Sequence, residues 1–212
     1  YGTFEEMLAR EATLAASERI DFVTVVTPNH LHFQPVKQAL AVGFHVVCDK
    51  PLAYSLDEGR ELEQLVVAGG KRFMLTHNYT GYPMVKQARH MIAADEIGTV
   101  MKVVVEFPQG WILALLGSSG LKVNPWRLDP RVSGISNCMG DIGTHCYNLA
   151  GYVTGLELES LCADLTCFRG QPLDNDGNVL LRYRGGAKGV LHASQVSFGE
   201  ACGLNIRVYG EK

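Results

Sequence analysis

The sequence predicts an α/β part, a doubly wound parallel sheet, followed by an α+β part with a mostly antiparallel open sheet. In the first 78 residues, strand patterns alternate with helix patterns, which is typical of parallel strands joined by helical crossovers. Later in the chain, β-type runs follow one another with turn signals between them, which indicates hairpins. We therefore expect a first domain over residues 1–78 and a second over 79–212.

Periodicity defines the elements of the first domain. A near-continuous β-branched run over 20–26 is typical of a parallel strand that is covered on both faces. Ser55 begins a capping box, and Gly69 and Gly70 close the helix that follows it. The other expected elements are helices over 3–16 and 31–42 and strands over 44–48 and 71–76.

The second domain is expected to begin with a helix over 83–94 and a β-rich stretch over 99–107. Residues 108–124 have no clean period and are predicted to form a loop. A helix is expected to start near Asp141. Four strands are then predicted over 156–168, 178–184, 187–196 and 204–209.

Composition is that of an ordinary globular protein, with 47% hydrophobic and 19% charged residues in 212. A net charge of −3 without a basic run argues against nucleic acid or an anionic membrane as principal partner. No run approaches about 18 apolar residues, so no membrane span is expected. Six cysteines without a C-x-x-C pair predict reduced thiols, no metal site and a cytoplasmic location.

Two motifs follow predicted strands of the parallel sheet. Thr27-Pro28-Asn29-His30 comes after the first strand and Asp49-Lys50-Pro51 after the second. Open parallel sheets bind ligands at the carboxyl ends of their strands, so both motifs are candidate binding loops. The structural alternative for the first motif, taken alone, is a simple turn. For Lys50, taken alone, it is a solvated surface charge. His32 is expected on a helix surface.

Gly140-Asp141-Ile142-Gly143-Thr144-His145 is a third motif, about ninety residues after the lysine. Asp141 and His145 are four residues apart, which in a helix places their Cβ atoms on one face, about 5–6 Å apart. Together with Lys50 they make an acid/base set. The structural alternative is that Asp141 caps the helix and is hydrogen-bonded to His145.

In this order the three motifs resemble the Gfo/Idh/MocA oxidoreductases, named for glucose-fructose oxidoreductase, inositol dehydrogenase and a rhizopine-catabolism protein. The resemblance runs from about residue 20 to 212. It implies a truncated Rossmann domain, because no G-x-G-x-x-G turn precedes these motifs here. It also implies that at least one further strand would follow residue 212, and that the chain alone binds the dinucleotide weakly.

The resemblance further implies roles for individual residues around NAD or NADP. His145 would exchange the hydroxyl proton, Asp141 would orient substrate or imidazole, and Lys50 would polarise the oxygen. Asp49 stands where most family members have Glu, and the Lys50–Pro51 bond is a candidate for the cis form. Cofactor contacts are expected from Thr27, Pro28, Asn29, His30, Asp49, Lys50, Pro51, Trp126 and Arg127, and substrate contacts from Lys50, Asn78, Tyr79, Arg127, Asp141 and His145.

The leading hypothesis is an NAD(P)-dependent oxidoreductase that transfers a hydride to or from a secondary alcohol carbon of a sugar, cyclitol or sugar derivative. The first alternative is a non-catalytic sugar- or dinucleotide-sensing regulator of the same fold. A second is a metal-dependent lyase or hydrolase that uses Asp141, His145 and His192. The resemblance also implies a homo-oligomer through the outer face of the second sheet, where Val179, Leu181 or Val190 would otherwise be exposed.

Overall fold

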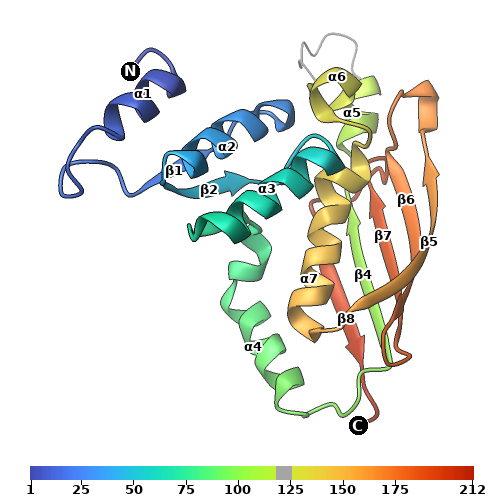
Figure 1. The fold of residues 1–212 in the computed structure, drawn as a ribbon. Helices are drawn as coiled ribbons and strands as arrows, with labels where there is room; N and C mark the ends of the chain where they lie inside the picture. Colours follow the sequence, from blue (N-terminus) through green and yellow to red (C-terminus); the bar gives the residue numbers. More distant parts are fainter. Residues whose placement is uncertain (118–125) are drawn as a thin grey trace. The chain divides into compact units, whose positions relative to one another are not determined.

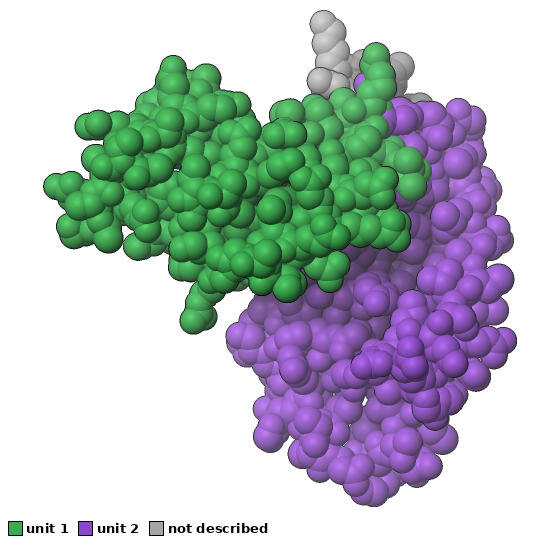
Figure 2. Space-filling view, viewed as in Figure 1, with its two compact units in different colours: residues 1–76, 131–135 green, residues 77–130, 136–212 purple. Residues whose placement is uncertain are grey.

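The computed structural model describes residues 1–117 and 126–212, which form two compact units (Figure 2). Unit 1 comprises residues 1–76 and 131–135, and unit 2 comprises residues 77–130 and 136–212. The sequence places the boundary after residue 78. In the structure the first unit ends at residue 76 and also includes the later segment 131–135. The order of strand and helix patterns along the chain does not reveal that this segment belongs to unit 1.

Unit 1 alternates strands and helices, as the sequence predicts (Figure 1). Its three strands are all parallel and lie in chain order, β1-β2-β3. The Ser55 side chain accepts a hydrogen bond from the Glu58 backbone N–H, which confirms the capping box. The elements are α1 (Phe4–Glu11), β1 (Phe22–Val25), α2 (Phe33–Ala41), β2 (His45–Asp49), α3 (Leu56–Gly69) and β3 (Phe73–Thr76).

The core of unit 1 lies on one face of this sheet, where Val36 of α2, Val46 of β2 and Leu62 of α3 are buried together. On the opposite face, Phe22 is 55% exposed and Met74 58%. The expectation that the first strand is covered on both faces is therefore wrong for the described residues. Successive crossovers of one hand between strands in chain order put α2 and α3 on the same side of the sheet.

Unit 2 contains a five-stranded sheet of order β5-β6-β7-β4-β8. Only β4 and β7 pair in parallel, so the predicted mostly antiparallel sheet is confirmed. Figure 1 shows α7 along one face of this sheet with α4 beside it. The elements are α4 (Pro83–Ala93), β4 (Lys102–Pro108), α5 (Trp111–Gly117), α7 (Thr144–Thr154), β5 (Leu158–Thr166), β6 (Asp176–Tyr183), β7 (Lys188–Ser194) and β8 (Asn205–Tyr209).

The prediction of a loop over 108–124 is wrong for residues 111–117, which form α5. This segment is rich in leucine and alanine, both strong helix formers, and its Ile112 is fully buried. Residues 118–125 of the predicted loop lie outside the described residues. A further short helix, α6 (Pro130–Ser133), follows the 3₁₀ turn Trp126–Leu128.

A π-helical turn, Met139–Gly143, leads directly into α7. The turn contains Asp141, and His145 lies in the first turn of α7. The simple α-helical spacing that the sequence predicts for these two residues is therefore replaced by a wider turn. π-turns of this kind are rare and occur frequently at functional sites. Among the described residues, no helix is both long and apolar enough to span a membrane.

Candidate active site

The binding loops predicted for unit 1 lie where parallel strands end. β1 and β2 run parallel, so the loops that follow them share one edge of the sheet. The Lys50–Pro51 peptide bond is cis, as the sequence predicts. The Asp49 carboxylate accepts hydrogen bonds from the Lys50 backbone N–H (2.8 Å) and from Thr76 Oγ1 (2.7 Å). Asp49 thereby ties the lysine loop to the neighbouring strand β3.

His32 is buried, with 1% of its surface exposed, so its expected place on a helix surface is wrong. A 3₁₀ turn over Asn29–Leu31 carries it beneath both loops. Its Nδ1 lies 2.8 Å from the Pro51 carbonyl oxygen and its Nε2 lies 2.7 Å from the Thr27 carbonyl oxygen. One imidazole therefore links the backbone of the two candidate binding loops.

The Thr27-Pro28-Asn29-His30 loop is held on its other side by the segment 131–135. Asn29 Nδ2 donates a hydrogen bond to the Ser133 carbonyl oxygen at 3.0 Å. The next residue, Gly134, has φ +106° and lies close to Tyr54, so a side chain there would be strained. His30 is exposed. Asn29 thus has a structural partner in addition to its predicted cofactor contact.

In unit 2, His145 lies in an aromatic setting and is 6% exposed. The Tyr79 ring meets it edge-on at 4.8 Å between centroids, with an interplanar angle of 89°. The rings of His77 and Phe107 also lie beside the imidazole, with centroid-to-centroid distances of 5.8 and 6.3 Å. The structure therefore brings together two of the predicted substrate-contacting residues, Tyr79 and His145. Asn78, another of them, is exposed in the 3₁₀ turn Asn78–Gly81.

The Tyr79 hydroxyl is electrostatically coupled to its neighbours. Burial, contact with Cys202 and the negative charge of Asp141 raise the pKa of Tyr79 to about 12. Near neutral pH the phenol therefore keeps its proton and remains a hydrogen-bond donor.

Asp141 has two defined cationic or donor partners. Gln195 Nε2 donates a hydrogen bond to Asp141 Oδ2 at 3.0 Å, and Arg127 Nε lies 3.6 Å from the same oxygen. Arg127 also stacks over the Trp126 ring, 4.3 Å from its centroid. Trp126, Arg127 and Asp141 are thus brought together as a group. Gln195 was missed from the sequence, where it appears only as a polar residue near the end of the strand predicted over 187–196.

The structure separates His192 from the other two members of the proposed metal set. His192 lies on β7, where its Nδ1 is 3.0 Å from Asn178 Oδ1. Its strand neighbours Leu191 and Ala193 are buried in the core beneath α7, so His192 points to the opposite face. The metal-dependent alternative is therefore wrong in its ligand set. Within residues 1–117 and 126–212, no three His, Cys, Asp or Glu residues cluster as a metal site.

Lys50 belongs to unit 1, whereas Asp141 and His145 belong to unit 2. Their convergence on one substrate remains a prediction. Lys50, Asp141 and His145 each make further polar or ring contacts within the protein.

Unit 1 is a parallel α/β unit, and unit 2 contains the second sheet and carries Asp141 and His145. This combination is typical of two-domain nicotinamide oxidoreductases. Residues 4–77 match the family described as "Oxidoreductase family, NAD-binding Rossmann fold", and residues 85–212 match the "GFO/IDH/MocA C-terminal domain". The chain belongs to the Gfo/Idh/MocA family of oxidoreductases.

Two curated relatives illustrate this kinship. The uncharacterized oxidoreductase YfiI of Bacillus subtilis is 32% identical, over 100% of this chain and 54% of its own length. Levoglucosan dehydrogenase of Pseudarthrobacter phenanthrenivorans is 27% identical, over 98% of this chain and 57% of its own length. The chain thus spans a little over half the length of these relatives.

Solved structures show the same fold. An inositol dehydrogenase homolog from Azotobacter vinelandii, complexed with NAD+, superposes with a TM-score of 0.91 at 33% identity, covering 100% of this chain and 54% of that one. The homolog complexed with NADH and myo-inositol gives a TM-score of 0.87 at 32% identity, covering 100% and 53%. The first unit therefore has the NAD-binding Rossmann fold of the family.

Proposed function

We propose that the protein containing this chain is a dehydrogenase that oxidises a secondary alcohol of a sugar, cyclitol or sugar derivative. The observation that carries the proposal is His145, a buried imidazole held edge-on by Tyr79 one turn after Asp141. Relatives that act on levoglucosan and a structural neighbour that binds myo-inositol support this substrate class.

The loops after β1 and β2 fit a nicotinamide cofactor. They lie at the carboxyl edge of a parallel sheet, and the buried His32 holds their backbones together. We assign Thr27, Pro28, Asn29, His30, Asp49, Lys50 and Pro51 to the nicotinamide and its ribose, with Trp126 and Arg127 as further contacts. When bound, the nicotinamide accepts or delivers the hydride.

The protein's own task is to manage one proton and to hold the substrate. His145 is the proposed base for the substrate hydroxyl, because an imidazole is the side chain best suited to proton transfer near neutral pH. Asp141 stays a hydrogen-bond acceptor beside Arg127 and Gln195, so its proposed role is to orient substrate or imidazole. Lys50 is assigned to polarise the substrate oxygen, and Asn78, Tyr79 and Arg127 to contact the substrate.

The regulatory alternative has less support. A sensor needs no proton-transfer set, yet this chain retains lysine, aspartate and histidine at all three positions, and Asp141 and His145 have defined partners. The relatives and structural neighbours described above are named as oxidoreductases or dehydrogenases.

The test is a screen of the gene-encoded protein with NAD+ and NADP+ against cyclitols, aldoses and anhydrosugars. We expect one substrate group to increase the absorbance of reduced nicotinamide. Dialysis against chelator should leave this rate unchanged. A protein that binds NADH and sugar tightly but turns over no member of the panel would favour the sensor instead.

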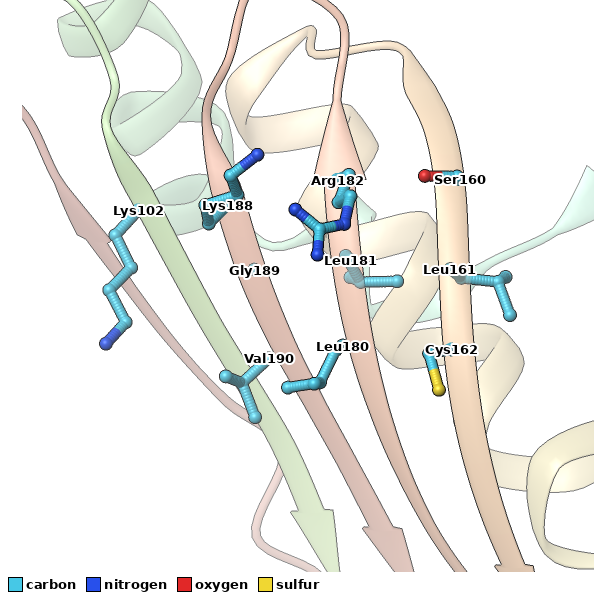
Figure 3. A pocket seen from close by; sticks show the side chains of 10 residues that line it. All are labelled: Lys102, Ser160, Leu161, Cys162, Leu180, Leu181, Arg182, Lys188, Gly189 and Val190. Atoms are coloured by element: carbon cyan, nitrogen blue, oxygen red, sulfur yellow. The ribbon is translucent and has the colours of Figure 1, made fainter.

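We also propose that the outer face of the unit 2 sheet pairs with a second copy. Figure 3 shows Leu180, Val190 and Cys162 on neighbouring strands, and Leu180 is 62% exposed. They line a hollow of about 420 Å³ with the cationic row Lys102, Lys188 and Arg182. The expected exposure of Val179 and Leu181 is wrong, because strand alternation turns both inward, to 4% and 3%.

Charge across this face is complementary to itself. The cationic row lies on one side of the apolar row of Leu180 and Val190. On the other side, Glu106 and Asp164 occupy the next outward positions of β4 and β5, level with His192 and Asn178. A two-fold axis along the apolar row would place Lys102 of one copy over Glu106 of the other, and Arg182 one strand away from Asp164. The like charges of Lys102, Lys188 and Arg182 on adjacent strands favour such a partner.

A further inference from the structure

Gln195 lies at the end of β7 and is fully buried. Its backbone is fixed on both sides, because its N–H donates to the Asn175 carbonyl (2.9 Å) and its carbonyl accepts from the Ile112 N–H (3.2 Å). Its side chain therefore starts from a fixed point. The amide extends from there to Asp141 Oδ2 at 3.0 Å.

A second buried amide determines how that side chain is turned. Asn137 is 1% exposed, and its Nδ2 donates to Gln195 Oε1 at 2.7 Å. An ionised carboxylate only accepts hydrogen bonds, so Asp141 requires the NH₂ end of Gln195 to face it. The oxygen end then faces Asn137, which must present its own NH₂ group. The direction of the whole chain follows from the charge on Asp141.

The Asn137 amide is oriented so that Gln195 Oε1 receives a donor, although within the part of the chain that the structure describes its own oxygen is left without one. Its Oδ1 is buried and, among the described residues, has no protein hydrogen-bond partner. Turning the amide over would bring Oδ1 against Gln195 Oε1, two acceptors facing each other. Asn137 itself is anchored by its backbone N–H, which donates to Asp174 Oδ1 at 2.8 Å.

We propose that Gln195 is a positioning residue for Asp141 and that Asn137 sets the orientation of Gln195. The series Asn137, Gln195, Asp141 fixes the direction of the Asp141 carboxylate, whose Oδ2 also has the Arg127 contact, for its role beside the substrate hydroxyl. This inference rests on the proposed dehydrogenase function. Its physical content is a chain of two hydrogen bonds with one allowed direction.

Three variants separate positioning from simple packing. Gln195→Glu keeps shape and the acceptor for Asn137 but places an oxygen against Asp141. Gln195→Met keeps length and loses both bonds, while Asn137→Leu leaves Gln195 in place without its orienting donor. Glu96→Gln, at an exposed position after α4, is the matched control.

We expect kcat to fall about tenfold to a hundredfold in all three variants, with KM for NAD+ within about twofold of the wild type. A packing role alone would lower the thermal midpoint and leave kcat of the folded enzyme unchanged. Wild-type kcat in folded Gln195→Glu and Gln195→Met would overturn the proposal.

A readout independent of turnover uses the side-chain amide protons. The Gln195 NH₂ signals, assigned by their loss in Gln195→Met, should shift in Asp141→Leu and in Asn137→Leu and stay fixed in Glu96→Gln. If the wild type oxidises no compound of the panel, the proposed function fails, and these shifts still decide whether the directed chain exists. Gln195 signals that do not respond to Asp141→Leu would refute it.

Discussion

Lys50 is the residue on which the proposed chemistry depends most directly in unit 1. It follows strand β2, and its backbone N–H is held by the Asp49 carboxylate at 2.8 Å. This bond fixes the backbone at Lys50, so the side chain starts from a defined position at the end of the strand.

Lys50→Met should lower kcat about 10²- to 10⁴-fold, because it removes the charge that polarises the substrate oxygen. Binding of NADH, followed by fluorescence titration, should weaken by a much smaller factor, because the other residues assigned to the nicotinamide and its ribose remain. Lys86→Met, on the exposed surface of α4, is the control and should retain wild-type kcat. A Lys50→Met enzyme within threefold of wild type would remove Lys50 from the mechanism.

Thiol reactivity should divide the six cysteines into two groups. Burial and the neighbouring Asp49 raise the pKa of Cys48 to about 12, and burial raises that of Cys146 to about 12. At pH 8 we expect Ellman's reagent to label only the exposed thiols Cys162, Cys167 and Cys202 quickly. Cys48, Cys138 and Cys146 should react only after unfolding in guanidinium. Rapid labelling of a fourth thiol in the native protein would contradict this.

The same shift gives a pH dependence of stability. Cys48 ionises near pH 9 in the unfolded chain and near 12 in the folded one, so the folded state holds the proton over that interval. Its contribution is complete below pH 9 and is lost as pH rises toward 12.

His32→Phe should weaken unit 1, because it removes the ring nitrogens that lie 2.8 and 2.7 Å from the Pro51 and Thr27 carbonyl oxygens. An imidazole with one N–H donates to one of these oxygens, so urea unfolding should show a loss of about 1–3 kcal/mol. His30→Phe, two residues earlier and exposed, should change the unfolding free energy by less than about 0.5 kcal/mol. Equal effects of both variants would argue against a linking role for His32.

Among the elements, the π-turn that carries Asp141 depends on a carboxylate from another part of the chain. Asp174, 5% exposed, accepts from the Asn137 N–H and the Met139 N–H, both at 2.8 Å. These bonds satisfy backbone groups where the chain enters the turn. The loop between β5 and β6 thereby positions the start of α7.

Asp174→Ala should therefore destabilise unit 2, by about 1.5–3 kcal/mol for each charge-assisted bond that is lost. Urea unfolding monitored by far-ultraviolet circular dichroism measures the change. Glu96→Ala, at an exposed position after α4 in the same unit, is the matched control and should lie within about 0.5 kcal/mol of wild type. Asp174→Ala as stable as this control would show that the turn is held by other contacts.

At the scale of the whole molecule, the exposed sheet face predicts association. Leu180→Glu places a charge in the apolar row of the proposed contact, so light scattering at micromolar concentration should report a lower mass than the wild type. Val67→Glu is the control, because Val67 is 81% exposed on α3 in unit 1. A wild-type protein that is already a stable monomer would remove the proposed contact.

The sequence by itself determined the alternation of strands and helices in unit 1, the hairpin order of unit 2 and the motifs around Lys50 and His145. These features are local, because periodicity and turn residues act over a few positions. Tertiary structure alone decided that His32 links two loops, that Asp141 lies in a π-turn, and that Gln195 donates a hydrogen bond to the Asp141 carboxylate. Gln195 is 54 residues from Asp141 and 58 from Asn137. Hydrogen bonds across such separations leave no periodic trace in a sequence, since only the packing of the sheet against α7 brings the partners together.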